Sequence, residues 1–142
     1  MVARPRLRQV VIDTLDARAS AEFWGALLGL VYRPGHQPPV DGAPDVAGRE
    51  WLNLRTVDGE PVLAFEQVSS LPRSTWPGDR VPQQLHLDLT VPDVAGLDAV
   101  HSRVLELGGT LLHDRSDDPI EPLRVYADLD GHPFCVFVTP DV

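Results

Sequence analysis

Two short segments of the chain show the apolar pattern of a strand. Residues 86–91 read HLDLTV, in which polar and apolar residues alternate throughout, and residues 9–14 read QVVIDT, in which Val10 and Ile12 give one face an apolar character. Successive side chains of a β-strand point to opposite faces of a sheet, so the alternation predicts two half-buried strands. The faces opposite the apolar ones then carry Gln9, Val11 and Asp13 in the first segment and His86, Asp88 and Thr90 in the second.

A helix is expected after each of these strands. Asp16 and Asp93 lie seven residues after the first residues of the two strands, and aspartate is a favoured helix N-cap. Residues 17–29 and 94–107 then show apolar residues at helical spacing, with glycine at or just after the end of each segment. The two halves of the chain therefore begin with the same strand and helix in the same register.

Three more strand-like segments follow each helix, at residues 30–33, 49–56 and 62–68 in the first half and 110–113, 122–128 and 134–138 in the second. The turn before the last segment is almost repeated, because residues 58–65 read DGEPVLAF and residues 130–137 read DGHPFCVF. Asp-Gly alone is a common hairpin turn. Its recurrence after matching strands and helices indicates an internal repeat.

The repeat predicts an α+β fold made of two βαβββ modules. They would span residues 5–68 and 83–139, joined by the Pro- and Gly-containing segment 71–82. Each half is too small to build a sufficient core alone, so we expect both to pack into one domain over residues 1–142.

Composition excludes several partners. The formal charge of −9 argues against nucleic acid and anionic membranes, because both are polyanions. The same charge would suit a cationic ligand, although an acidic surface also simply keeps a protein soluble. No apolar run approaches a membrane span or a signal-peptide core. One cysteine rules out an intrachain disulfide, and we expect a cytoplasmic protein.

Four segments carry a resemblance to a known superfamily: DARASAEFWGALLGL at residues 16–30, HLDL at 86–89, LELGG at 105–109 and ADLDGHPFC at 127–135. In this order they resemble the vicinal-oxygen-chelate (VOC) superfamily, and within it the glyoxalase-like domains related to bleomycin resistance proteins. The resemblance implies mixed sheets that curve around a shared cleft, commonly completed in a homodimer.

The resemblance also implies where a metal would bind. Metal-dependent members hold a divalent cation with one side chain from the first and one from the last strand of each module. In the register of the repeat these positions are Gln9, Leu63, His86 and Cys135. Leu63 has no donor atom, and Gln9 is neutral. Cys135 is a soft ligand, whereas the metal-dependent members bind Zn, Ni, Fe or Mn through Glu and His. Only His86 matches well, so we expect no tightly held metal.

The same register predicts a ligand-binding cleft with a few polar groups on an apolar, partly aromatic wall, lined by Gln9, Val11, Leu63, Phe65, His86, Asp88, Cys135 and Phe137. His86 is the best catalytic candidate, because Asp88 on the same strand could bias its protonation; a structural, half-exposed histidine is the alternative. Apolar neighbours favour a small buried thiol over a nucleophile at Cys135.

Other residues receive weaker assignments. Trp24 is expected in the core, and Trp76 is a lid residue or an anchor in the joining segment. Further candidates for the cleft lining are Trp51 with Asn53 and Arg124 with Tyr126. The remaining histidines show no metal-ligand spacing and receive no role: His36, His101, His113 and His132.

Three classes of function remain open. The first is a binding protein, or an enzyme without a tightly held metal, that takes up a small organic molecule. The second is a metal-dependent lyase, isomerase or dioxygenase in which one Zn, Ni, Mn or Fe ion acts as a Lewis acid. The third is a regulatory domain that has kept the fold without a ligand. A carboxylate at position 63 would favour the second class, and Leu63 favours the other two.

Overall fold

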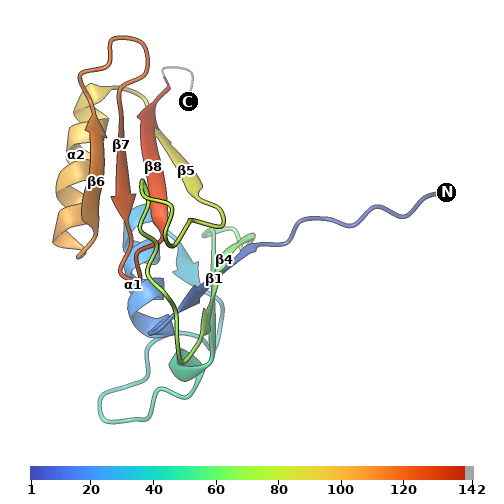
Figure 1. The fold of residues 1–142 in the computed structure, drawn as a ribbon. Coiled ribbons are helices and arrows are strands. Elements are labelled where there is room, and N and C mark those ends of the chain that lie inside the picture. The colour runs from blue at the N-terminus through green and yellow to red at the C-terminus, as the bar shows by residue number, and fades with distance from the viewer. Residues whose placement is uncertain (140–142) are drawn as a thin grey trace. The chain divides into compact units, whose positions relative to one another are not determined.

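The computed structural model describes residues 1–139. The chain forms two compact units, Met1–Leu71 and Pro72–Val142. Each contains one four-stranded sheet and one long helix in the order β-α-β-β-β (Figure 1). The predicted α+β fold of two βαβββ modules is therefore confirmed, whereas their packing into one domain stays a prediction. None of the described helices has the length and hydropathy that crossing a membrane requires.

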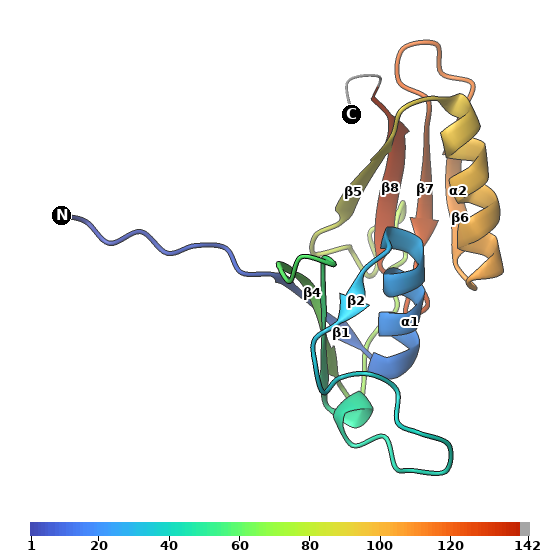
Figure 2. The same cartoon turned by 180° about the vertical axis from the view of Figure 1, so that it is seen from behind.

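The first unit contains a mixed sheet of order β1-β4-β3-β2. Its elements are β1 (Val10–Thr14), α1 (Ala17–Leu28), β2 (Val31–Tyr32), a short 3-10 helix η1 (Ala47–Arg49), β3 (Trp51–Arg55) and β4 (Pro61–Gln67). β1 pairs with β4 in parallel and the other pairs are antiparallel. Figure 2 shows α1 lying along this sheet. Trp24 of α1 is 1% exposed, as expected of a core residue.

The second unit repeats this topology with the strand order β5-β8-β7-β6. Its elements are β5 (Leu87–Val91), α2 (Val94–Glu106), β6 (Thr110–Arg115), β7 (Leu123–Ala127) and β8 (Pro133–Val138). α2 covers one face of this sheet (Figure 1). Leu97 and Val104 of the helix and Val136 of the sheet are fully buried, so the core of this unit lies between helix and sheet.

Both helices begin at the predicted residues. The Asp16 carboxylate accepts a hydrogen bond from the backbone N–H of Ala19 at 2.9 Å, and the Asp93 carboxylate accepts one from Gly96 at 2.8 Å. These bonds satisfy N–H groups that have no partner within the first helical turn. α1 ends at Gly29 with φ 67°, a left-handed conformation that glycine adopts without strain.

The predicted equivalence of Leu63 and Cys135 is wrong by one residue. β1 places Val11 opposite Ala64, whereas β5 places Asp88 opposite Cys135. Since the two first strands agree in register with their helices, Ala64 is the residue that corresponds to Cys135. The repeated turn sequence does not reveal this shift, because the turn itself matches in both halves.

A β-bulge in the first unit causes the shift. Leu54 pairs with Leu63 but the next residue, Arg55, pairs with Pro61, so β4 has one additional residue at Val62. The pairing of β7 with β8 runs without such an irregularity. A bulge inserts one unpaired residue and thereby reverses which face the following side chains occupy.

The bulge also corrects the predicted cleft lining. Leu63 and Phe65 pair with Val10 and Ile12, and paired residues share a face of the sheet. Ile12 and Phe65 are both buried, on the face that α1 covers. Leu63 and Phe65 therefore belong to the core of the first unit and do not lie on the face of Val11.

The two Asp-Gly turns differ in what surrounds their glycines. Gly59 has φ 94° and Gly131 has φ 92°. A Cβ added to Gly59 would meet nothing within 4 Å, whereas one added to Gly131 would lie 2.3 Å from Cγ of Arg73. Arg73 is held there by a 3.0 Å hydrogen bond from its guanidinium to the backbone oxygen of Leu129.

We predict that Gly131→Ala destabilises the protein more than Gly59→Ala. Both substitutions place alanine at positive φ, at a cost of about 1–2 kcal/mol, and Gly131→Ala must also displace Arg73, which adds about 1 kcal/mol of overpacking. Urea denaturation measures both free energies. In an Arg73→Ala background the two substitutions should lower the free energy of unfolding equally. Equal losses in the wild-type background would contradict the close approach of Arg73 to Gly131.

Candidate functional site

The second unit contains a pocket of about 480 Å³. Strand pairing aligns Asp88, Cys135, Val125 and His113 in one row across the sheet. The next row consists of Thr90, Phe137, Leu123 and Arg115. Paired residues share a face, and seven of these eight side chains line the pocket, all except Thr90. The pocket therefore lies on the face of the sheet that α2 leaves uncovered.

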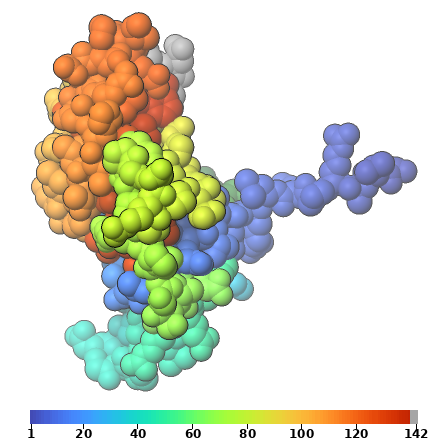
Figure 3. All heavy atoms as spheres, in the orientation of Figure 1, coloured from blue at the N-terminus to red at the C-terminus, as the bar shows by residue number. Residues whose placement is uncertain are grey.

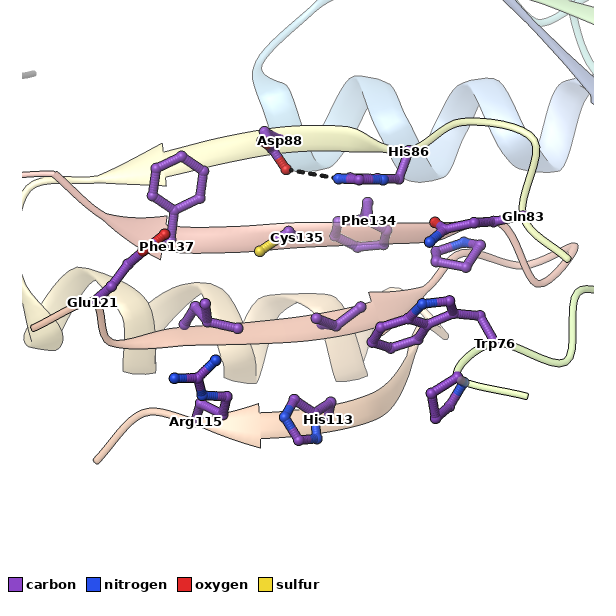
Figure 4. A pocket seen from close by; sticks show the side chains of 14 residues that line it. Trp76, Gln83, His86, Asp88, His113, Arg115, Glu121, Phe134, Cys135 and Phe137 are labelled. Atoms are coloured by element: carbon purple, nitrogen blue, oxygen red, sulfur yellow. Dashed lines mark ion pairs between the residues drawn. The ribbon is translucent and has the colours of Figure 1, made fainter. Parts of the chain in front are cut away.

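Apolar and polar groups are segregated within this pocket. The central strands β7 and β8 contribute the apolar side chains of Leu123, Val125 and Phe137 together with the Cys135 thiol, as Figure 4 shows for the labelled residues. The outer strands contribute polar groups: Asp88 on β5, and His113 and Arg115 on β6. An apolar floor with a few polar groups at its margins is typical of a small-molecule site.

The segment 72–83, which we call the strap, forms one end of the pocket. Trp76, Pro77 and Gln83 of the strap line it, and Figure 3 shows this yellow-green segment lying against the orange and red surface of the same unit. Thr75 and Val81 close the strap into a loop, since each backbone N–H donates to the other residue, at 2.8 and 2.9 Å. Trp76 is thus a half-buried wall of the pocket, and its role as a lid or an anchor stays a prediction.

His86 and Asp88 lie together at the β5 margin. Nε2 of His86 is 3.3 Å from Oδ1 of Asp88, and their side chains are 47% and 57% exposed (Figure 4). The expected proximity of the two side chains is therefore present, although His86 directly precedes the first residue of β5. A catalytic role for His86 stays a prediction.

Cys135 is half-buried in the floor. Burial raises the pKa of its thiol to about 11, and the negative charges of Asp88 and Glu121 add to this effect. The thiol is consequently neutral near pH 7. This environment is the opposite of the electropositive surroundings that activate a nucleophilic cysteine.

Arg124 and Tyr126 do not line the pocket, and their candidacy as cleft residues is wrong. They pair with Val136 and Phe134 on the face covered by α2. The buried Arg124 guanidinium donates to Asp98 at 2.9 Å and to Asp114 at 3.1 Å. These hydrogen bonds compensate the burial of its charge.

Tyr126 is joined to a histidine for which the sequence suggested no role. Its hydroxyl lies 3.1 Å from Nδ1 of His101 on α2. Tyr126 is fully buried, and a buried hydroxyl needs such a partner. His101 therefore has a structural place in the core of the second unit.

The first unit carries a small polar cluster on the face opposite α1. The Asn53 amide donates to Oε1 of Gln9 at 2.6 Å, and Asn53 pairs with Ala64, which also pairs with Val11. Nδ1 of His36 accepts the backbone N–H of Asn53 at 3.0 Å. Burial and nearby arginines lower the pKa of His36, which keeps the imidazole neutral and able to accept this bond.

The residues at the family's metal positions do not form a fitting ligand set. With the corrected register these residues are Gln9, Ala64, His86 and Cys135. Ala64 offers no donor atom, the Gln9 oxygen already accepts from Asn53, and the Cys135 thiol has a raised pKa. A metal needs deprotonated thiolate or carboxylate ligands to offset its charge, and here only His86 is a good one.

Asp128, Asp130 and His132 form the group of described residues whose ligand atoms lie close enough to hold a metal, within 4.8 Å of one another. One Asp128 oxygen already accepts the backbone N–H groups of Asp130 and His132, at 3.1 and 2.9 Å. These two bonds shape the Asp-Gly turn. A structural role in the turn therefore accounts for Asp128.

The family model for the glyoxalase-like domain matches residues 9–137. The chain belongs to the glyoxalase-like domain family of the VOC superfamily. No curated protein matches it. Since the match spans both modules, the family resemblance suggested by the sequence is confirmed.

Solved structures share the fold of this glyoxalase-like domain. A glyoxalase/dioxygenase from Nostoc punctiforme is 21% identical with a TM-score of 0.65, and the match covers 99% of this chain and 97% of the Nostoc chain. A glyoxalase/bleomycin resistance protein/dioxygenase family enzyme from Burkholderia phytofirmans is 14% identical, with a TM-score of 0.64 and coverages of 92% and 96%. The fosfomycin resistance protein FosX from Listeria monocytogenes is 13% identical, with a TM-score of 0.66 and coverages of 98% and 95%.

Of the predicted cleft residues, the structure brings His86, Asp88, Cys135 and Phe137 together in the pocket. The sequence reasoning missed the lining residues Pro77, Gln83, His113, Arg115, Glu121, Leu123, Val125, Pro133 and Phe134. His113 and Arg115 alternate along β6, so pairing this strand with β7 could have placed them. Gln83 and Glu121 lie in loops, where no periodic pattern applies.

We predict that Cys135 reacts slowly with iodoacetamide near neutral pH, with a half-maximal rate near pH 11. Asp88→Asn should lower the pKa of the thiol, because it removes one of the negative charges that raise it, and should speed alkylation at pH 8 a few-fold. Cys135 is the only cysteine, so mass spectrometry measures the rate directly. The control Glu106→Gln also removes one negative charge, but on α2 and outside the pocket, so it should leave the alkylation rate of Cys135 unchanged.

Proposed function

We propose that this glyoxalase-like domain binds a small organic molecule in the pocket of its second module, without a tightly held metal. The observation that carries the proposal is the pocket of about 480 Å³ with an apolar floor and polar margins. Its volume falls within the range of about 300–1,000 Å³ that is typical of small-molecule sites. The strap adds an aromatic wall at Trp76, which provides area for a ring of the ligand.

The absence of a tightly held metal is supported by the ligand set. Three of the four family positions lack a suitable donor: Ala64, Gln9 and the neutral thiol Cys135. His86 alone does not hold a divalent cation against water. The function proposed is therefore one that side chains carry out through binding, orientation and charge.

We also propose a homodimer located in the cytoplasm. The family resemblance supports the dimer, and sedimentation equilibrium at micromolar concentration is its direct test. Cytoplasmic location is supported by the single cysteine, since proteins of oxidising compartments commonly carry disulfides.

A thermal-shift screen of several hundred drug-sized aromatic compounds should find ligands whose affinity depends on the pocket. Calorimetry should show binding weakened about 5- to 30-fold by Phe137→Ala, because an aromatic contact in the floor is lost. Leu105→Ala on α2, which also shortens a partly exposed apolar side chain, is the control and should leave the affinity unchanged. Equal affinities for both variants, or a screen without any ligand, would refute the proposal.

Elemental analysis of the protein purified without an affinity tag should show much less than one Zn, Ni, Mn or Fe per chain, in the wild type and in His86→Ala alike. Loss of a single outer-shell partner typically lowers metal affinity about 10–100-fold. A site that lacks several direct ligands should lose far more affinity than that. About one metal ion per chain in the wild type, and none in His86→Ala, would make a metal-dependent enzyme the preferred function. Loss on His132→Ala instead would locate the metal at the Asp-Gly turn.

A further inference from the structure

Gln83 of the strap carries a buried acceptor. Its side-chain oxygen Oε1 is inaccessible to solvent and has no hydrogen-bond partner among the described residues. Gln83 lines the pocket next to Trp76 (Figure 4). A solvent-inaccessible oxygen is also out of reach of a ligand, so Gln83 contributes wall area beside Trp76 and no hydrogen bond to the ligand.

Two carboxylates give the pocket a negative character. Asp88 and Glu121 both line it. The lining cation Arg115 donates to Asp118, so its charge is already compensated. Burial is the main cause of the raised pKa of Cys135, and the charges of both carboxylates add to it, so both act on the floor of the pocket. A positively charged ligand group would therefore be stabilised here and a carboxylate would be repelled.

The apolar surface limits the shape of the ligand. Trp76 closes one end of the pocket and Phe137 lies toward the other, with Cys135 between them (Figure 4). Val125 pairs with Cys135 across the sheet. A flat ring system would cover this floor and leave its polar substituents at the margin, where Asp88 lies.

We propose that the pocket selects protonated aromatic amines, with the ring on the floor and the ammonium group at Asp88. This specificity rests on the proposed function, namely that the pocket binds a small organic molecule. An ammonium group donates hydrogen bonds and carries a positive charge, so it suits a carboxylate acceptor. Asp88 is then a specificity-determining residue, and the amine is bound without a chemical step.

Three compounds that differ only in their terminal group test the selection: 2-(1-naphthyl)ethylamine, 2-(1-naphthyl)ethanol and 1-naphthylacetate. Calorimetry at about pH 8.5, above the usual titration range of histidine, should show the amine binding at least about tenfold more tightly than the acid. The alcohol, which keeps the donor but lacks the charge, should fall between them. An acid that binds as tightly as the amine would overturn the inference.

The variant Asp88→Asn tests the role of the carboxylate. It should weaken amine binding about three- to tenfold, a modest effect because the carboxylate is partly exposed, and should leave the affinity for the alcohol within about twofold of the wild type.

Glu106→Gln is the matched control for charge. It removes one carboxylate from the exposed surface of α2, and amine affinity should stay within about twofold of the wild type. If Glu106→Gln and Asp88→Asn weaken the amine equally, attraction to the acidic surface explains the binding and the inference is overturned. Circular dichroism of every variant verifies that the fold is intact.

The outcome also separates this inference from the proposed function. If the three naphthyl compounds fail to bind but the aromatic library yields neutral or anionic ligands sensitive to Phe137→Ala, only the selectivity for amines is refuted. If neither set yields a ligand sensitive to Phe137→Ala, the proposed function is refuted as well. Amine binding that depends on Asp88 supports both.

Discussion

The alternation of side chains along β8 joins the core of the second unit to its pocket. Phe134 and Val136 are buried on the face covered by α2, while Cys135 and Phe137 line the pocket on the other face. Shifting this strand by one residue would exchange the two pairs, exposing core residues and burying the pocket floor. The free energy that keeps Phe134 and Val136 buried therefore also holds the pocket residues in place.

The first unit shows what such a shift does. The bulge at Val62 moves β4 by one residue relative to β8, so that Leu63 and Phe65 become core residues. Ala64 then occupies the position of Cys135, and its methyl group brings neither a polar atom nor bulk. The two modules share a topology, but one register change gives different chemistry to the sheet faces that their helices leave uncovered.

Charges are also divided between the two faces of the second sheet. On the face of α2, the Arg124 guanidinium is neutralised by Asp98 and Asp114, which stabilises a cation in a buried position. On the pocket face, Asp88 has His86 beside it and Glu121 faces the same space. The two faces thus differ in their charged groups: a paired cation lies on the buried face, whereas two carboxylates line the pocket.

The sequence by itself determined the local elements and their repetition. Alternation in residues 86–91, capping by Asp16 and Asp93 and the recurring Asp-Gly turns depend on neighbouring residues, so they could be read from the order of amino acids. Four of the predicted cleft residues, including His86 and Cys135, share the pocket for the same reason. Only the tertiary structure decided the bulge at Val62, the faces of Leu63 and Arg124, and the position of the strap. All three features depend on hydrogen bonds and packing between residues far apart in the chain, such as the bond from Arg73 to Leu129. Local sequence patterns do not predict contacts of this kind.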